Sequence, residues 1–310
     1  MASSSSESRV MSGHAVQERA ADTDSLLVMQ SLWAMERRHP DGFESSLDQN
    51  VARILDGGFD GISGHCVDPV KVRLIAKAIA GTGLAMEGMC FPRTVDDLKP
   101  SLECATGIGV THLSVQPDVR LRRIDDCIPL VEGWMRLAEE VDFPIYFETH
   151  RNRMTTDLFF TLDLIERIPS MPILADLSHI LVGREFWYPL SSEDEALVFQ
   201  VLDHTWAFHG RVASREQVQV EISFPQHQVW LDLFLRWWEY GFRSWRQRAK
   251  AGTQLSFTCE LGPRPYAITD KEDNDTTDRW TEALLLKSRV RELWRRIVDD
   301  ERHGTLQIPA

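Results

Sequence analysis

The chain has 310 residues and a formal net charge of −13, a balance that disfavours nucleic acids and anionic membrane surfaces as partners. Its hydrophobic fraction of 43% is enough for a sizeable core, and no apolar run approaches the roughly 18 residues of a membrane span. The five cysteines are scattered without a CxxC pair, which indicates reduced thiols in a cytoplasmic protein and not a disulfide framework.

The N-terminal stretch differs in composition from the rest of the chain. Residues 1–23 are rich in serine and other polar residues and contain no apolar signal-peptide core, so we expect a disordered tail. Residues 24–310 show no linker and no break in composition. We therefore expect one domain over 24–310, a usual size for an α/β barrel.

From residue 26 onward, short apolar runs alternate with segments of helical periodicity. Strands are expected at 26–33, 59–63, 84–91, 110–116 and 144–148, followed by three that end at Asp176, His209 and Glu260. Helices are expected near 47–55, 68–81, 94–107, 124–141, 156–168, 192–202, 226–249 and 277–299. Asp68 and Pro69 are typical of a helix cap and first turn.

This alternation predicts an α/β protein with the (β/α)8 TIM barrel fold. The main competitor is an open doubly wound sheet, which would need a glycine-rich phosphate loop after its first strand. The stretch Gln-Ser-Leu-Trp-Ala-Met-Glu at 30–36 has no glycine, so the barrel is favoured.

Four successive expected strands end in a candidate metal ligand: Glu148, Asp176, His209 and Glu260. Strand ends of a barrel face one rim, so we expect these side chains to converge. Each residue alone could be a surface or salt-bridged group, but three close carboxylates repel each other strongly without a cation. Three carboxylates and one imidazole suit a hard divalent ion. We expect one ion per chain, Mn²⁺ first, with Mg²⁺, Co²⁺ and Zn²⁺ as alternatives.

With these strand-end residues the chain resembles the xylose-isomerase-like TIM barrels, and among them the ketose 3-epimerases. The resemblance implies that the four residues hold one divalent metal and that Glu148 and Glu260 also transfer protons. It further implies that His179, three residues after the Asp ligand, and Arg215, six residues after the His ligand, hold substrate oxygens.

Two departures from that family indicate a larger or differently decorated substrate than a free hexose. Glu148 is followed by Thr-His-Arg instead of a hydrophobic or proline-containing loop, and the connection after His209 is long and rich in tryptophan. His150 and Arg151 are therefore candidate substrate contacts, as is His65 at the second strand end. For His65 the alternative is a hydrogen-bonded rim residue. The further ligands of the two-metal xylose isomerases and the trinuclear endonucleases are not evident.

The sequence thus predicts a divalent-metal-dependent isomerase or epimerase of a sugar or keto-sugar. One glutamate would remove the proton beside a carbonyl to give an enediolate, and the other would return a proton. The alternative is a β-eliminating lyase that cleaves C- or O-glycosidic bonds of 3-keto-glycosides, because the same intermediate can expel a substituent. Metal-dependent phosphodiester cleavage and a non-catalytic partner subunit are the remaining classes. We expect a small-molecule sugar or glycoside as ligand, no nucleic acid, no membrane, and a homo-oligomer or a complex with a small partner subunit.

Overall fold

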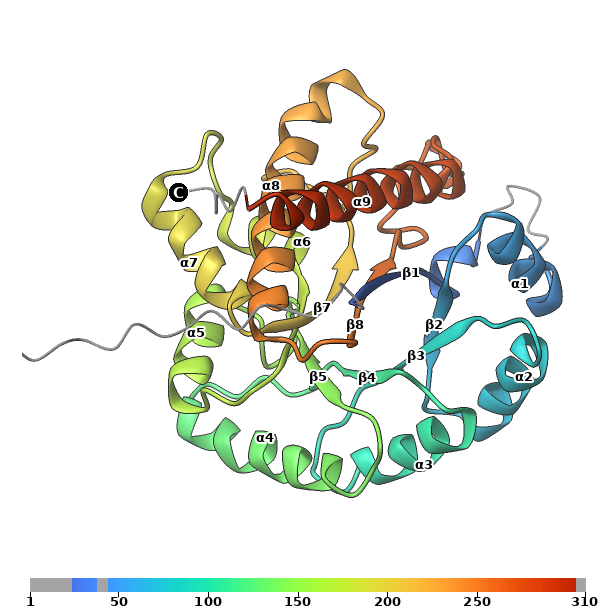
Figure 1. Ribbon diagram of the computed structural model, residues 1–310, viewed down its shortest axis with the longest axis vertical. Coiled ribbons are helices and arrows are strands. Elements are labelled where there is room, and N and C mark those ends of the chain that lie inside the picture. Colours follow the sequence, from blue (N-terminus) through green and yellow to red (C-terminus); the bar gives the residue numbers. More distant parts are fainter. Residues whose placement is uncertain (1–23, 38–43, 305–310) are drawn as a thin grey trace, which may run out of the picture.

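The computed structural model describes residues 24–37 and 44–304, which form a closed barrel of eight parallel strands surrounded by helices (Figure 1). The strands follow one another around the barrel in sequence order, and β8 pairs with β1 to close it. This confirms the (β/α)8 barrel and its organisation as one domain. The predicted tail, 1–23, lies outside the described residues. No helix among the described residues is long and apolar enough to cross a membrane.

The strands are β1 (Ser25–Ser31), β2 (Gly61–His65), β3 (Ala85–Cys90), β4 (His112–Val115), β5 (Ile145–Glu148), β6 (Ile173–Asp176), β7 (Thr205–Gly210) and β8 (Gln254–Cys259). The helices are η1 (Trp33–Met35), α1 (Leu47–Asp56), α2 (Pro69–Ile79), α3 (Leu98–Ile108), α4 (Ile124–Ala138), α5 (Leu158–Arg167), α6 (Leu177–Arg184), α7 (Ser192–Leu202), η2 (Pro225–His227), α8 (Gln228–Arg248) and α9 (Arg279–Arg302).

Strand alternation decides which side chains enter the barrel. In β5, Phe147 belongs to the core between sheet and helices, so Glu148 points to the interior. In β7, Phe208 belongs to the same core, and His209 points inward. The apolar residue before each polar strand end therefore fixes the direction of the polar one.

Aromatic side chains of α8 complete the core on the side of β7 and β8. Trp237 and Trp238 are fully buried, and the Trp238 ring meets the Phe257 ring edge-on at 5.0 Å between centroids. Glycine at 241 allows the close approach of this helix to β7, because a Cβ there would lie 2.7 Å from the Phe208 ring. The tryptophan-rich segment is thus a packing helix.

The sequence predicted the cap of one helix, α2, and missed another helix, α6, altogether. Asp68 caps α2 by accepting a hydrogen bond from the Val70 N–H at 2.8 Å, as predicted. The prediction missed α6, which begins directly after β6. In its sequence, Leu-Ser-His-Ile-Leu-Val-Gly-Arg, the polar residues are not gathered on one face, and the first five residues, polar ones included, are all buried. All five cysteines are free thiols, as expected.

Candidate metal centre and substrate site

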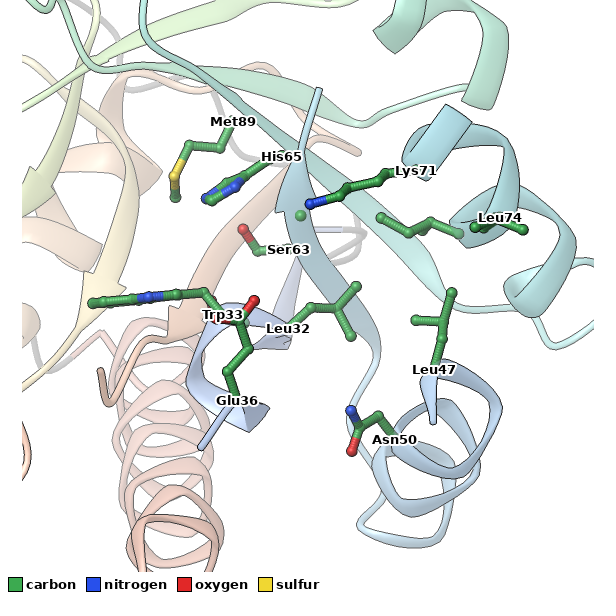
Figure 2. Close-up of a pocket in the computed structure, with 13 residues that line it drawn as sticks. Leu32, Trp33, Glu36, Leu47, Asn50, Ser63, His65, Lys71, Leu74 and Met89 are labelled. Atoms are coloured by element: carbon green, nitrogen blue, oxygen red, sulfur yellow. The ribbon is translucent and has the colours of Figure 1, made fainter. Parts of the chain in front are cut away.

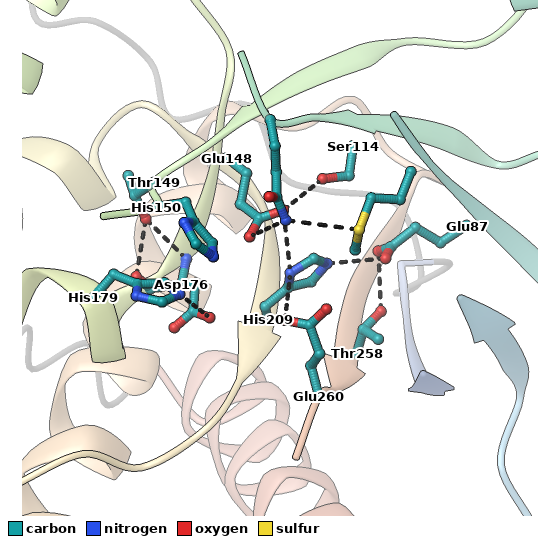
Figure 3. Close-up of polar contacts among 12 residues, drawn as sticks. Glu87, Ser114, Glu148, Thr149, His150, Asp176, His179, His209, Thr258 and Glu260 are labelled. Atoms are coloured by element: carbon teal, nitrogen blue, oxygen red, sulfur yellow. Dashed lines mark hydrogen bonds and ion pairs between the residues drawn. The ribbon is translucent and has the colours of Figure 1, made fainter. Parts of the chain in front are cut away.

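The four predicted ligands converge at the carboxyl-terminal end of the barrel (Figure 3). Glu148, Asp176 and His209 come from the ends of β5, β6 and β7, and Glu260 directly follows β8. One ligand atom from each lies within 4.8 Å of the others, and all four side chains are buried. The cluster has the spacing for a single ion, while the roles of the four residues remain predictions.

His209 has different partners on its two ring nitrogens. Its Nε2 lies 2.9 Å from Glu87 Oε1, whereas its Nδ1 lies 3.5 Å from Glu148 Oε2 and 3.3 Å from Glu260 Oε2. Burial alone would lower the pKa of His209, but the charges of Glu260, Glu87 and Glu148 outweigh it and raise that pKa well above its ordinary value. A proton on Nδ1 therefore offsets the carboxylate charge, and a cation at that nitrogen would take its place.

Glu87 on β3 fixes the orientation of the His209 ring. Besides His209, its carboxylate accepts hydrogen bonds from His112 Nε2 at 2.9 Å and Thr258 Oγ1 at 3.0 Å. Burial would raise the pKa of Glu87, but its two histidine partners lower it below the ordinary range, so the group stays ionised. Sequence reasoning missed this residue. Its one signal is a single charge within the apolar run Ala85–Cys90.

Glu148 is held by neutral donors from the β4 side. The Ser114 hydroxyl donates to its Oε2 at 2.9 Å, and the Gln116 amide lies 2.9 Å from both carboxylate oxygens. These contacts fix the plane of the carboxylate without adding charge. Neither donor was predicted, because Ser and Gln at a strand end are common in any barrel.

Asp176 and Glu260 are bridged by an arginine that the sequence analysis also missed. Arg211 Nη2 donates to Asp176 Oδ2 at 3.0 Å and to Glu260 Oε2 at 2.7 Å, and the side chain is 1% exposed. It lies two residues beyond His209, so it leaves the end of β7 on the same side.

The donor set of the cluster fits a divalent cation. Three carboxylates and one imidazole meet in a buried space, and His209 Nδ1 faces the carboxylates of Glu148 and Glu260 without a well-aligned hydrogen bond in the described part of the chain. An oxygen-rich set with one nitrogen matches hard or borderline metals. A single guanidinium leaves much of the carboxylate charge uncompensated.

Three of the predicted substrate contacts lie on the Asp176 side of the cluster, and His179 contacts Asp176 itself. His179, on α6, places Nε2 3.6 Å from Asp176 Oδ2, and its ring centroid is 3.8 Å from that of His150 (Figure 3). The Arg151 guanidinium carbon lies 5.3 Å from the centroid of the Tyr266 ring, in the loop after β8. These groups thus surround one side of the cluster.

Arg215 lies against α6, and His65 lines a pocket beside β2. Arg215 donates from Nε to the Glu185 carbonyl at 3.0 Å, and its guanidinium carbon lies 3.5 Å from the Trp187 ring centroid. These contacts place it against the end of α6, and its substrate role stays a prediction. His65 ends β2, is exposed, and meets the Phe91 ring edge-on.

A pocket of ≈ 260 Å³ opens beside the cluster, between β1, β2, α1 and α2 (Figure 2). In Figure 2, Met89, His65 and Trp33 lie on one side and Leu47 and Leu74 on the other. Met89 connects it to the cluster, because its sulfur lies 3.6 Å from the Gln116 amide that holds Glu148. The pocket and the candidate metal centre therefore share a wall.

No family model and no curated protein matches the sequence. Among solved structures, the chain is similar to the probable 3-DHS dehydratase AsbF from Bacillus anthracis, with a TM-score of 0.56 at 12% identity over 86% of this chain and 98% of that one. A xylose isomerase-like TIM barrel protein from Mycobacterium smegmatis, in complex with magnesium, gives 0.54 at 12% identity over 86% and 98%. D-psicose 3-epimerase in the presence of D-fructose gives 0.54 at 10% identity over 86% and 99%. At these identities the likeness shows the fold.

Proposed function

We propose that this chain, which has the fold of the xylose-isomerase-like TIM barrels, is a divalent-metal-dependent isomerase or epimerase of a sugar or keto-sugar. The observation that supports this most is the buried convergence of two glutamates, an aspartate and a histidine with an open Nδ1. A bound divalent ion would supply Lewis acidity that favours loss of a proton beside a carbonyl. Mn²⁺ is the proposed ion and the cytoplasm the proposed compartment.

The two glutamates carry the proposed proton transfers. Ser114 and Gln116 hold Glu148, and Arg211 holds Glu260, so each carboxylate has a fixed orientation. One would accept the proton next to the carbonyl, and the other would return a proton on the opposite face. Return to the same carbon gives epimerisation, whereas return to the neighbouring carbon gives isomerisation. Burial of both groups keeps bulk water from competing for the proton.

The side pocket favours a second candidate, a β-eliminating lyase on 3-keto-glycosides. Its walls include Leu32, Leu47, Leu74 and Ile75, a surface that suits an apolar substituent more than a sugar hydroxyl. A glycoside whose sugar ring sits at the metal centre could place its aglycone there. Removal of the proton beside the carbonyl by Glu148 or Glu260 would then let the enolate expel that aglycone.

An exchange experiment in D₂O tests both candidates. Protein loaded with Mn²⁺ is incubated with free ketoses and with 3-keto-glycosides, and deuterium uptake and aglycone release are followed. Uptake into a ketose supports the isomerase or epimerase, and aglycone release supports the lyase. We expect Glu148→Gln to abolish either signal, since an amide cannot accept the proton, and Glu185→Gln at the exposed end of α6 to leave it intact. Absence of both signals in the wild type contradicts the proposal.

A further inference from the structure

Arg211 has hydrogen-bond donors that the described residues do not use. Its Nη2 bridges Asp176 and Glu260, but its Nε and Nη1 are buried without a partner anywhere in 24–37 and 44–304. Buried N–H groups that are left unpaired cost free energy, and guanidinium donors cost more because they are charged. The arrangement therefore calls for an acceptor that a ligand brings.

The surroundings of Arg211 are cationic and aromatic on the side away from the two carboxylates. Its guanidinium carbon lies 4.7 Å from the Tyr266 ring centroid, and Arg151 lies 5.3 Å from the same centroid. The His179 ring meets Tyr266 edge-on at 6.4 Å, and neither of its nitrogens has a hydrogen-bond partner among the described residues. Two guanidinium groups and one imidazole with free polar atoms thus surround one ring.

Arg151 is a second cation beside the same ring. The carboxylates of Glu148, Asp176 and Glu260 face Arg211 and the candidate ion, and the ionised Glu87 is held by His209 and His112. Arg151 makes no ion pair in the part of the chain that the structure describes, so no carboxylate there contacts its guanidinium. A neutral sugar would leave the Arg151 guanidinium and the open Arg211 donors without an anionic partner.

We infer that the substrate carries a carboxylate, which Arg211 and Arg151 bind beside Tyr266, so that the ligand is a sugar acid or keto acid and not a neutral sugar. A planar carboxylate matches the fixed donors of a guanidinium. A phosphate dianion needs more donors and is repelled more strongly by the neighbouring carboxylates. This inference rests on the proposed function, because it places the anion next to the same metal centre.

Arg167 provides a matched control for Arg211. It is the same residue type at the exposed end of α5, and its guanidinium donates to Asp125 at 2.9 Å. Loss of this side chain removes an arginine without touching the cluster. Arg151 is partly exposed, so its replacement carries little risk for folding.

The test compares the binding of D-gluconate, D-glucitol and D-glucitol 6-phosphate to Mn²⁺-loaded protein by titration calorimetry. Gluconate and glucitol share one polyol chain and differ in the carboxylate, so their ratio measures recognition of the anion. We expect gluconate to bind at least about tenfold more tightly than glucitol, in line with a charge-assisted hydrogen-bonded pair. Arg151→Gln, Arg211→Gln and the charge-retaining Arg211→Lys should each reduce that ratio, and Arg167→Gln should preserve it.

Several results would overturn the inference: equal binding of gluconate and glucitol, no binding of either at millimolar concentration, tighter binding of the phosphate, or an unchanged ratio in Arg151→Gln and Arg211→Lys. Metal content measured on the same samples keeps the two ideas apart. A wild type without a bound ion contradicts the proposed function, whereas a metal-loaded wild type without a gluconate preference contradicts the carboxylate site alone.

Discussion

The two nitrogens of the His209 ring have different surroundings: Nε2 faces Glu87, and Nδ1 faces the clustered carboxylates. Nε2 lies against Glu87, which also accepts from His112 and Thr258, so this nitrogen is committed to the barrel interior. Nδ1 is left facing the carboxylates of Glu148 and Glu260. A histidine that donates through one nitrogen is fixed in the tautomer that offers the other to a metal.

Removal of a single ligand should remove the metal. We expect about one divalent ion per wild-type chain and a large loss in Asp176→Ala and His209→Ala, because each change takes one ligand from a small set. Elemental analysis of the purified proteins measures this. His204→Ala, just before the start of β7, serves as the control and should retain the ion. Equal metal content in all variants would rule out this site.

Glu87 should act on metal binding without touching the ion. Glu87→Gln removes the charge that orients His209, and partners of this kind change metal affinity by roughly 10–100-fold. Competition with a chelator measures the change. Thr258→Ala deletes one hydrogen bond to Glu87 and leaves its charge, so its effect should be much smaller. An affinity that is unchanged in Glu87→Gln would show that the His209 ring is positioned by packing alone.

At the level of elements, the approach of β7 to β8 depends on one glycine. Gly210 directly follows His209, and a Cβ at this position would lie 2.2 Å from the Phe257 ring. We expect Gly210→Ala to lower the free energy of unfolding by about 1–3 kcal/mol, as overpacked cores do, and to weaken metal binding by displacing the end of β7. Denaturant unfolding and metal analysis give the two readouts.

Gly107→Ala is the matched control for that change. Gly107 lies in α3, and a Cβ there would meet nothing within 4 Å. Alanine in a helix is favoured over glycine, so this variant should be neutral or stabilised by about 0.4–1 kcal/mol. Equal free energies of unfolding and equal metal contents in Gly210→Ala and Gly107→Ala would show that close packing of Gly210 against Phe257 matters for neither stability nor metal binding.

The sequence predicted the barrel and the four clustered residues because both follow from short-range patterns. An apolar run that ends in Glu, Asp or His indicates where a strand ends and which polar side chain lies at that end. The helix α6 was missed because it is buried at its start and lacks a polar face. Arg211 and Glu87 were missed because their importance comes from side chains 35 and 122 residues away, a pairing that no local pattern records.

For the molecule as a whole, one buried carboxyl outside the site makes stability depend on pH. Glu282 on α9 is 3% exposed, and burial first, then the charge and hydrogen bond of Glu221, raise its pKa well above the ordinary value of 4.5. Below pH 4.5 the Glu282 carboxyl carries its proton in both the folded and the unfolded chain. As the pH rises, the unfolded chain releases it first, so this contribution to stability is lost up to the folded-state pKa.

Glu282→Gln should therefore flatten the decline of stability above pH 4.5, because the amide keeps a hydrogen bond and has no proton to lose. Denaturant unfolding at a series of pH values tests this. Glu292→Gln, on the exposed face of the same helix, should follow the wild-type curve. Parallel curves for wild type and Glu282→Gln would mean that Glu282 does not have a raised pKa in the folded chain.

The two halves of the barrel carry separate parts of the site. The four clustered residues come from the ends of β5 to β8, whereas the side pocket is lined by residues of β1 to β3, α1 and α2. Leu47 and Leu74 line that pocket and belong to helices that supply none of the four clustered residues. Under the proposed function, substitutions in this half should change which substrate is accepted while the four clustered residues stay in place, so directed evolution of specificity should begin there.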